Sequence, residues 1–128
     1  MSGNALIVES NDMLVRMYRA IFSALDCSVV HARTREEARR LLRGASPNLI
    51  VVDERLADGL GIDAVREIRM NRDFLKTPII ATISRRGSVE DGDLRALGVA
   101  SVVTKPWQFS AFSQLAKNYL NNPSAVVS

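Results

Sequence analysis

A chain of 128 residues with 47% hydrophobic and 24% charged residues has the size and composition of one globular domain, which excludes collagen-like, disordered and coiled-coil proteins. Its apolar runs are far shorter than the ~20 residues of a membrane helix. The N-terminus lacks the basic region and apolar stretch of a secretory signal, so we expect a cytoplasmic protein with no membrane partner.

The positive charge is concentrated in one stretch of the chain. Between Met13 and Arg43, seven arginines stand against three acidic residues, whereas the formal net charge of the whole chain is only +3. We interpret this stretch as a solvated face, or as a surface for an acidic protein partner. The modest total charge argues against nucleic-acid binding. Six of these arginines are candidates for one basic patch: Arg16, Arg19, Arg35, Arg39, Arg40 and Arg43.

In chain order, the first predicted elements form two strand–helix units. An apolar strand at Ala5 to Val8 precedes an amphipathic helix from Asn11 to Leu25, in which Asn11 is the candidate N-cap. A second strand, Ser28 to Ala32, precedes a helix from Thr34 to Gly44. Thr34 and Glu37 have the spacing of a capping box at the start of that helix.

Three further units follow the same pattern. Their strands are apolar almost throughout, as in sheets that are covered on both faces. The predicted strands are Leu49 to Asp53, Ile79 to Ile83 and Ala100 to Thr104. The helices are marked by Ile62, Val65 and Ile68, by Leu94 and Leu97 before Gly98, and by Phe112, Leu115, Ala116 and Tyr119.

Five such units with right-handed crossovers predict a doubly wound α/β fold: a five-stranded parallel sheet flanked by five helices. We expect the domain to span residues 4–120. Residues 121–128, which include Pro123, are predicted to be a C-terminal tail or the start of a linker.

Charged residues stand at the carboxyl ends of three predicted strands, where ligands gather in such folds. Glu9 follows the first strand, Asp53 ends the third, and Lys105 follows the last, directly before Pro106. Two carboxylates and an ammonium group suit phosphoryl transfer, in which cations neutralise the transferring group. A single charged residue at a strand end is common, because strands end at the protein surface. Three such residues at one edge of the sheet favour a site for phosphoryl transfer.

At these residues the sequence resembles the receiver domain of bacterial two-component response regulators, from about Asn4 to Leu120. The residues that carry the resemblance are Ala5 to Asn11, Pro47 to Asp53, Gly61, Pro78 to Ile80, Gly98 and Thr104 to Trp107. The resemblance implies a flavodoxin-like fold. It also implies a signalling module that catalyses its own phosphorylation without being an enzyme in the turnover sense.

The resemblance implies a role for several residues. Asp53 matches the aspartate phosphorylated by a histidine kinase or phosphotransfer protein, and Lys105 matches the lysine that contacts the phosphoryl group. Pro106 matches a proline preceded by a cis peptide bond. Glu9 matches an acid of the pocket that binds Mg²⁺, together with Asp53 and the backbone carbonyl of Arg55.

The sequence departs from the family pattern at three positions. Ser10 replaces the second pocket acid, so we expect weakened Mg²⁺ binding. Ile83 stands where the family has a Thr or Ser that binds the phosphoryl group. Thr82 should face the other side of the strand, and Ser84 could substitute only if its loop bends back. Val102 replaces an aromatic residue that changes rotamer on activation in many receivers. We call this aromatic position and the Thr or Ser position together the usual switch.

The Arg55 side chain suggests a further hypothesis. Its guanidinium could supply a fixed positive charge beside Glu9 and Asp53, or it could simply point to solvent from a loop. A dinucleotide fingerprint at Gly59 to Ala64 is a weak alternative, because Glu54 to Asp58 separate it from the preceding strand.

Two functions remain open on the sequence alone. The first is a receiver that accepts a phosphoryl group on Asp53. The second is a phosphorylation-independent pseudo-receiver, an interaction module that would bind a protein partner through its fourth helix, fifth strand and fifth helix. Dimers through the fourth and fifth helical faces are common in the family and are compatible with this sequence.

Overall fold

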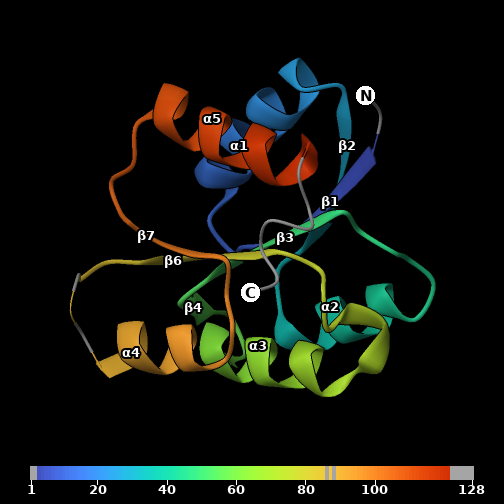
Figure 1. The fold of residues 1–128 in the computed structure, drawn as a ribbon, viewed down its shortest axis with the longest axis vertical. Helices are drawn as coiled ribbons and strands as arrows, with labels where there is room; N and C mark the ends of the chain where they lie inside the picture. Colours follow the sequence, from blue (N-terminus) through green and yellow to red (C-terminus); the bar gives the residue numbers. More distant parts are fainter. Residues whose placement is uncertain (1–2, 86, 88, 122–128) are drawn as a thin grey trace.

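The computed structural model describes residues 3–85, 87 and 89–121. Five parallel strands form one sheet in the order β2-β1-β3-β6-β7, which confirms the predicted doubly wound α/β fold (Figure 1). The strands are β1 (Gly3–Val8), β2 (Cys27–Ala32), β3 (Leu49–Asp53), β6 (Ile79–Ile83) and β7 (Ser101–Thr104). The helices are α1 (Asp12–Ala24), α2 (Arg35–Leu42), α3 (Gly61–Met70), α4 (Val89–Ala96) and α5 (Phe109–Asn121).

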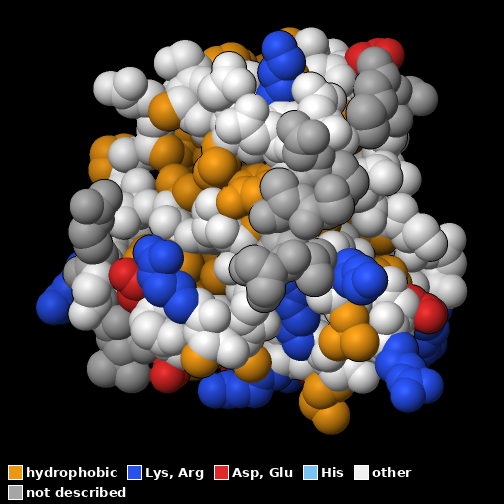
Figure 2. Space-filling model, viewed as in Figure 1, with side chains coloured by type: hydrophobic (Ala, Val, Ile, Leu, Met, Phe, Trp, Pro, Cys, Tyr) orange, Lys and Arg blue, Asp and Glu red, His pale blue; other side chains and the backbone are white. Residues whose placement is uncertain are grey.

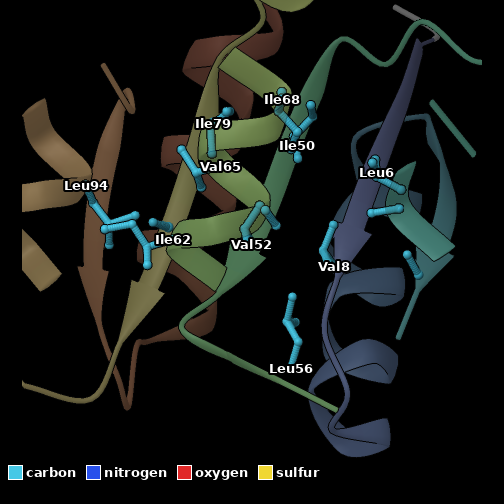
Figure 3. Close-up of a cluster of buried hydrophobic side chains, with 14 of the residues drawn as sticks. Leu6, Val8, Ile50, Val52, Leu56, Ile62, Val65, Ile68, Ile79 and Leu94 are labelled. Atoms are coloured by element: carbon cyan, nitrogen blue, oxygen red, sulfur yellow. The ribbon is translucent and has the colours of Figure 1, made fainter. Parts of the chain in front are cut away.

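The sheet lies between two helical layers. In Figure 1, α1 and α5 cover one face, whereas α2, α3 and α4 cover the other. Since side chains alternate along a strand, β3 contributes to both cores. Leu49 and Val51 pack toward α1. Ile50 and Val52 pack toward α3, as Figure 3 shows. We call these two cores the α1-side and α3-side clusters.

The predicted caps are present in the structure. The Asn11 side chain accepts a hydrogen bond from the backbone N–H of Leu14 at 3.1 Å. Thr34 accepts one from the N–H of Glu37 at 3.0 Å. The Glu37 carboxylate, in turn, accepts from the N–H of Arg33, one residue before the position that a capping box uses.

A short antiparallel hairpin, which the sequence analysis missed, follows β3. It consists of β4 (Arg55–Leu56) and β5 (Gly59–Leu60), and Asp58 lies in its turn. The Asp58 carboxylate accepts hydrogen bonds from the first two backbone N–H groups of α2, at 2.8 and 3.1 Å. These contacts help to keep the pKa of Asp58 below its usual value. A short 3-10 helix, η1 (Arg72–Phe74), was also not predicted.

The basic stretch is partly neutralised by α3. Arg35 and Arg39 both bind the Glu67 carboxylate, at 2.9 and 2.8 Å, and these contacts lower the pKa of Glu67 to about 2. The space-filling view shows Lys and Arg side chains along the layer that contains α2, α3 and α4 (Figure 2). In the part of the chain that the structure describes, no helix is long and apolar enough to cross a membrane.

Helix α5 extends one residue into the predicted C-terminal tail. Asn121, the first residue of the predicted tail, is the last residue of α5. The rest of that predicted tail lies outside the described residues, so the assignment of a tail or linker there stays a prediction.

Candidate functional site

The predicted site residues converge where the strand order reverses between β1 and β3, the usual place for a ligand in a doubly wound sheet. Asp53 is the last residue of β3, and Lys105 follows β7. The Lys105 Nζ donates to Asp53 Oδ1 at 2.7 Å, across 52 residues of sequence. Asp53 is only 4% exposed, whereas the side chain of Lys105 is 26% exposed, so water reaches this ion pair mainly from the lysine side.

Two further donors hold the Asp53 carboxylate. The Thr82 hydroxyl donates to Oδ1 at 2.8 Å, and the backbone N–H of Arg55 donates to Oδ2 at 3.1 Å. Asp53 and Thr82 are neighbours in the register of β3 and β6. The carboxylate is therefore fixed by a side chain from β6, a lysine after β7 and the backbone of β4.

Glu9 lies beside this pair and is 2% exposed. Its Oε2 accepts from the backbone N–H of Asn11 at 3.1 Å, whereas its Oε1 has no hydrogen-bond partner among the described residues. His31 Nε2, on the edge strand β2, donates to the Glu9 carbonyl at 2.7 Å. Burial, reinforced by the nearby charge of Asp53, raises the pKa of Glu9 to about 7.

Ser10 brings no charge to the second acidic position. Its carbonyl accepts a hydrogen bond from the Arg33 guanidinium at 3.0 Å, and the same guanidinium forms an ion pair with Asp12. This ion pair lowers the pKa of Asp12. The pocket therefore has two carboxylates near Lys105, those of Glu9 and Asp53, and a hydroxyl group where the family pattern has a third.

The positions of the usual switch are apolar and lie on the other side of the sheet from Thr82. Ile83 is fully buried in the α3-side cluster, and Val102 packs against that cluster. Ser84 forms hydrogen bonds with Glu54 and not with Asp53. Its backbone N–H and its hydroxyl both donate to the Glu54 carboxylate. Ser84 therefore does not replace the missing hydroxyl at Asp53.

Thr82 is the contact that the sequence analysis missed. Strand alternation correctly placed Thr82 on the face opposite Ile83, but that face is also the face of the Asp53 side chain. The signal was present in the sequence, because Asp53 lies two residues after Val51, on the α1 side of β3. Pairing the ends of β3 and β6 would have brought the two side chains together.

The remaining predicted residues fall around this centre. The Lys105–Pro106 peptide bond is cis. Arg55 is exposed, and among the described residues its guanidinium makes no hydrogen bond or ion pair with either carboxylate, which favours the solvent-facing reading of this side chain.

A cluster of aromatic side chains lies beneath the site, on the α1 side of the sheet. The ring centroids of Tyr18 and Trp107 are 5.2 Å apart, and those of Trp107 and Phe112 are 4.7 Å apart. The Tyr18 hydroxyl lies beside the side chains of Thr82 and Trp107, and burial raises the pKa of this tyrosine. Neither the Tyr18 hydroxyl nor Trp107 Nε1 has a hydrogen-bond partner among the described residues.

The residues present fit a Mg²⁺ ion in part. Proteins hold Mg²⁺ through one or two carboxylates and leave its other positions to water and phosphate. Glu9 and Asp53 supply two carboxylates, and Glu9 Oε1 is a buried oxygen without a partner among the described residues. No group of three or more His, Cys, Asp or Glu side chains is arranged around a metal position in the described ranges. The donor set is therefore sufficient but sparse.

Fold and site together define a doubly wound α/β domain with a buried, lysine-paired aspartate at the carboxyl end of its sheet. The chain matches the response regulator receiver domain family over residues 5–117 and belongs to that family. It is 24% identical over 122 residues to the polar-differentiation response regulator DivK of Brucella ovis, which covers 95% of this chain and 99% of that protein.

Solved structures have the same fold. A CheY-like response regulator receiver domain protein from Methanospirillum hungatei superposes with a TM-score of 0.87 at 18% identity, covering 98% of each chain. The receiver domain of a sensor histidine kinase from Pseudomonas aeruginosa gives a TM-score of 0.84 at 21% identity, covering 94% of this chain and 99% of that one. That structure has a magnesium ion coordinated in its active-site cleft.

This protein is thus a response regulator receiver domain of two-component signalling, a family of signalling modules that interact with histidine kinases or phosphotransfer proteins. The phosphorylation-independent alternative is not favoured.

Proposed function

We propose that Asp53 accepts the phosphoryl group that this receiver takes from a histidine kinase or phosphotransfer protein. The observation that carries the proposal is the 2.7 Å contact between Lys105 Nζ and Asp53 Oδ1 in a nearly buried pocket. A lysine at this distance supports a nucleophilic carboxylate because it stays beside the phosphoryl group and offsets its negative charge as the new bond forms.

The chemistry needs little more than position and charge. An oxygen of Asp53 attacks phosphorus, the bond between phosphorus and the donor breaks, and the donor keeps the electron pair. A bound Mg²⁺ would add positive charge at the transferring group, and Glu9 and the Arg55 carbonyl would hold it beside Asp53. The product is an acyl phosphate on this chain, so the protein is modified once and does not act as a turnover enzyme.

Intact mass spectrometry tests this proposal. Wild-type protein incubated with acetyl phosphate and Mg²⁺ is expected to gain the mass of one phosphoryl group, since Asp53 displaces acetate from phosphorus. Asp53→Asn is the matched control and should gain nothing, because the amide that replaces the carboxylate is not a nucleophile for this step. Uptake by Asp53→Asn would assign the modification to another residue, and no uptake by wild type would end the proposal.

We also propose that the Mg²⁺ affinity of this site is reduced because Ser10 replaces a carboxylate. Ser10→Asp is expected to tighten Mg²⁺ binding about tenfold or more, since a further negative charge favours a hard cation. The emission of Trp107, the only tryptophan, can follow the titration. Ser46→Asp, a substitution in the exposed loop before β3, is the control for charge alone. Equal Mg²⁺ affinities for Ser10→Asp and wild type would show that position 10 does not face the metal.

For the downstream partner we propose the surface formed by α4, β7 and α5. Val102 on β7 is only partly buried. It packs against the α3-side cluster, which also contains Leu94 of α4. Because Ile83 and Val102 replace the hydroxyl and the aromatic ring of the usual switch, this surface is expected to respond less to phosphorylation than in a typical receiver.

A further inference from the structure

The Asp53 carboxylate has a distinctive distribution of donors. Oδ1 receives two of them, the Thr82 hydroxyl at 2.8 Å and Lys105 Nζ at 2.7 Å, whereas Oδ2 receives only the Arg55 N–H at 3.1 Å. An ionised carboxylate offers about two acceptor positions on each oxygen. In this arrangement both acceptor positions of Oδ1 are filled, and one position on Oδ2 stays open for a reacting atom.

The Thr82 hydroxyl is held firmly enough to set this distribution. Thr82 is fully buried, and its β-branched side chain has few rotamers. The strand that carries it is also anchored, because the Thr82 carbonyl accepts from the N–H of Glu54, the residue after Asp53, at 2.9 Å. The Tyr18 hydroxyl also lies beside the Thr82 side chain. The donor and the carboxylate are therefore fixed with respect to each other by backbone as well as side chain.

We propose that Thr82 is a positioning residue for phosphoryl transfer: its hydroxyl, together with Lys105, occupies Oδ1 of Asp53 so that Oδ2 makes the attack on phosphorus. The inference rests on the proposed function, acceptance of the phosphoryl group by Asp53. It gives Thr82 a different task from that of a switch residue, because Thr82 contacts the nucleophile on the α1 side of the sheet. The residue at the usual switch position, Ile83, is in the α3-side cluster.

The step itself requires no proton from Thr82. Oδ2 forms the bond to phosphorus, the bond from phosphorus to the acetate oxygen breaks, and acetate leaves with the electron pair. The hydroxyl hydrogen stays on Thr82 and continues to face Oδ1, which becomes the carbonyl oxygen of the acyl phosphate. Without the hydroxyl, Oδ1 regains an open acceptor position and the carboxylate has one restraint fewer on its rotation.

Two substitutions that differ by one oxygen atom test this inference. Thr82→Ser keeps the hydroxyl and Thr82→Ala removes it, and both lose the same methyl group. The initial rate of phosphoryl uptake from acetyl phosphate, followed by intact mass, is expected to stay within about threefold of wild type in Thr82→Ser. In Thr82→Ala it should fall about tenfold or more, as expected for the loss of a hydrogen bond to a charged group.

Controls separate positioning from stability. Thr77→Val removes a threonine hydroxyl in the bend two residues before the start of the same strand and should leave the rate unchanged. Thermal unfolding of each variant shows whether it is folded at the assay temperature, and Thr82→Val gives a second hydroxyl-free variant that retains the wild-type volume.

The outcomes distinguish the two proposals. Slow uptake in Thr82→Ala and Thr82→Val, restored in Thr82→Ser, supports the positioning role. Equal rates in the Ser and Ala variants, with normal uptake by wild type, overturn that role and leave the function of Asp53 intact. No uptake by wild type overturns the proposed function of Asp53, and the role of Thr82 with it.

Discussion

Replacing Gly61 with alanine is expected to destabilise the protein severely. A Cβ atom at this position would lie 1.9 Å from the Asp53 carbonyl oxygen and 2.9 Å from its carbonyl carbon. Both are backbone atoms, which cannot move aside as a flexible side chain would. Gly61 begins α3, and its N–H donates to the Glu54 carbonyl at 2.9 Å, so relief of the clash would also break this contact.

We expect Gly61→Ala to lower the free energy of unfolding by more than about 3 kcal/mol, which for a domain of this size corresponds to about 10 °C in Tm. The matched control is Gly92→Ala in α4, where a Cβ would meet nothing within 4 Å. Alanine there should stabilise the helix by about 0.5–1 kcal/mol. Similar Tm values for the two variants would contradict the close approach of α3 to Asp53.

The second large effect is expected from Glu9→Gln, as a function of pH. Burial raises the pKa of Glu9 to about 7 in the folded protein, from 4.5 in a model carboxyl group. Between these two pH values the folded state holds a proton that the unfolded state has released. The free energy of unfolding of the wild type therefore falls as the pH rises from about 4.5 to 7.

Glutamine is neutral at every pH and escapes this loss. Glu9→Gln should match wild type near pH 4 and exceed it by up to about 3 kcal/mol at pH 8, because one pKa unit corresponds to about 1.4 kcal/mol. Urea unfolding in the presence of a chelator measures the difference without bound metal. Glu90→Gln, in the first turn of α4, is the control and should change stability by less than about 0.5 kcal/mol. Parallel curves for Glu9→Gln and wild type from pH 5 to pH 8 would contradict the burial of a costly charge at position 9.

The centre of the sheet was predictable because β1, β3 and β6 are buried on both faces for most of their length. The run from Leu49 to Asp53 is bounded in the sequence by Pro47 and Asn48 on one side and by charged residues on the other, and the predicted strand has the same bounds as β3. Helix α1 was equally clear, since its cap and its apolar spacing agree. The hairpin β4–β5 was missed because strands of two residues have no periodicity to detect.

The site residues at strand ends were predictable from the sequence. The contact that depends on the register between two strands was not predicted. Glu9, Asp53 and Lys105 each stand at the end of a strand, so convergence at one edge follows from parallel topology. Alternation along each strand already puts the side chains of Thr82 and Asp53 on the same side of the sheet, but their contact also needs the register of β6 against β3, which comes from the structure. The structure is also needed to see that Glu9 Oε1 lacks a hydrogen-bond partner among the described residues, because a sequence does not show which oxygen is left without one.

The capping of α2 by Asp58 links two parts of the chain that would otherwise vary independently. The hairpin follows β3 in the chain, yet the aspartate in its turn accepts from the N–H groups of Arg35 and Glu36 in α2. An insertion or deletion between β3 and α3 would move this carboxylate away from the helix. Among related chains, the length of this loop and the identity of residue 58 are therefore expected to change together with the start of the second helix.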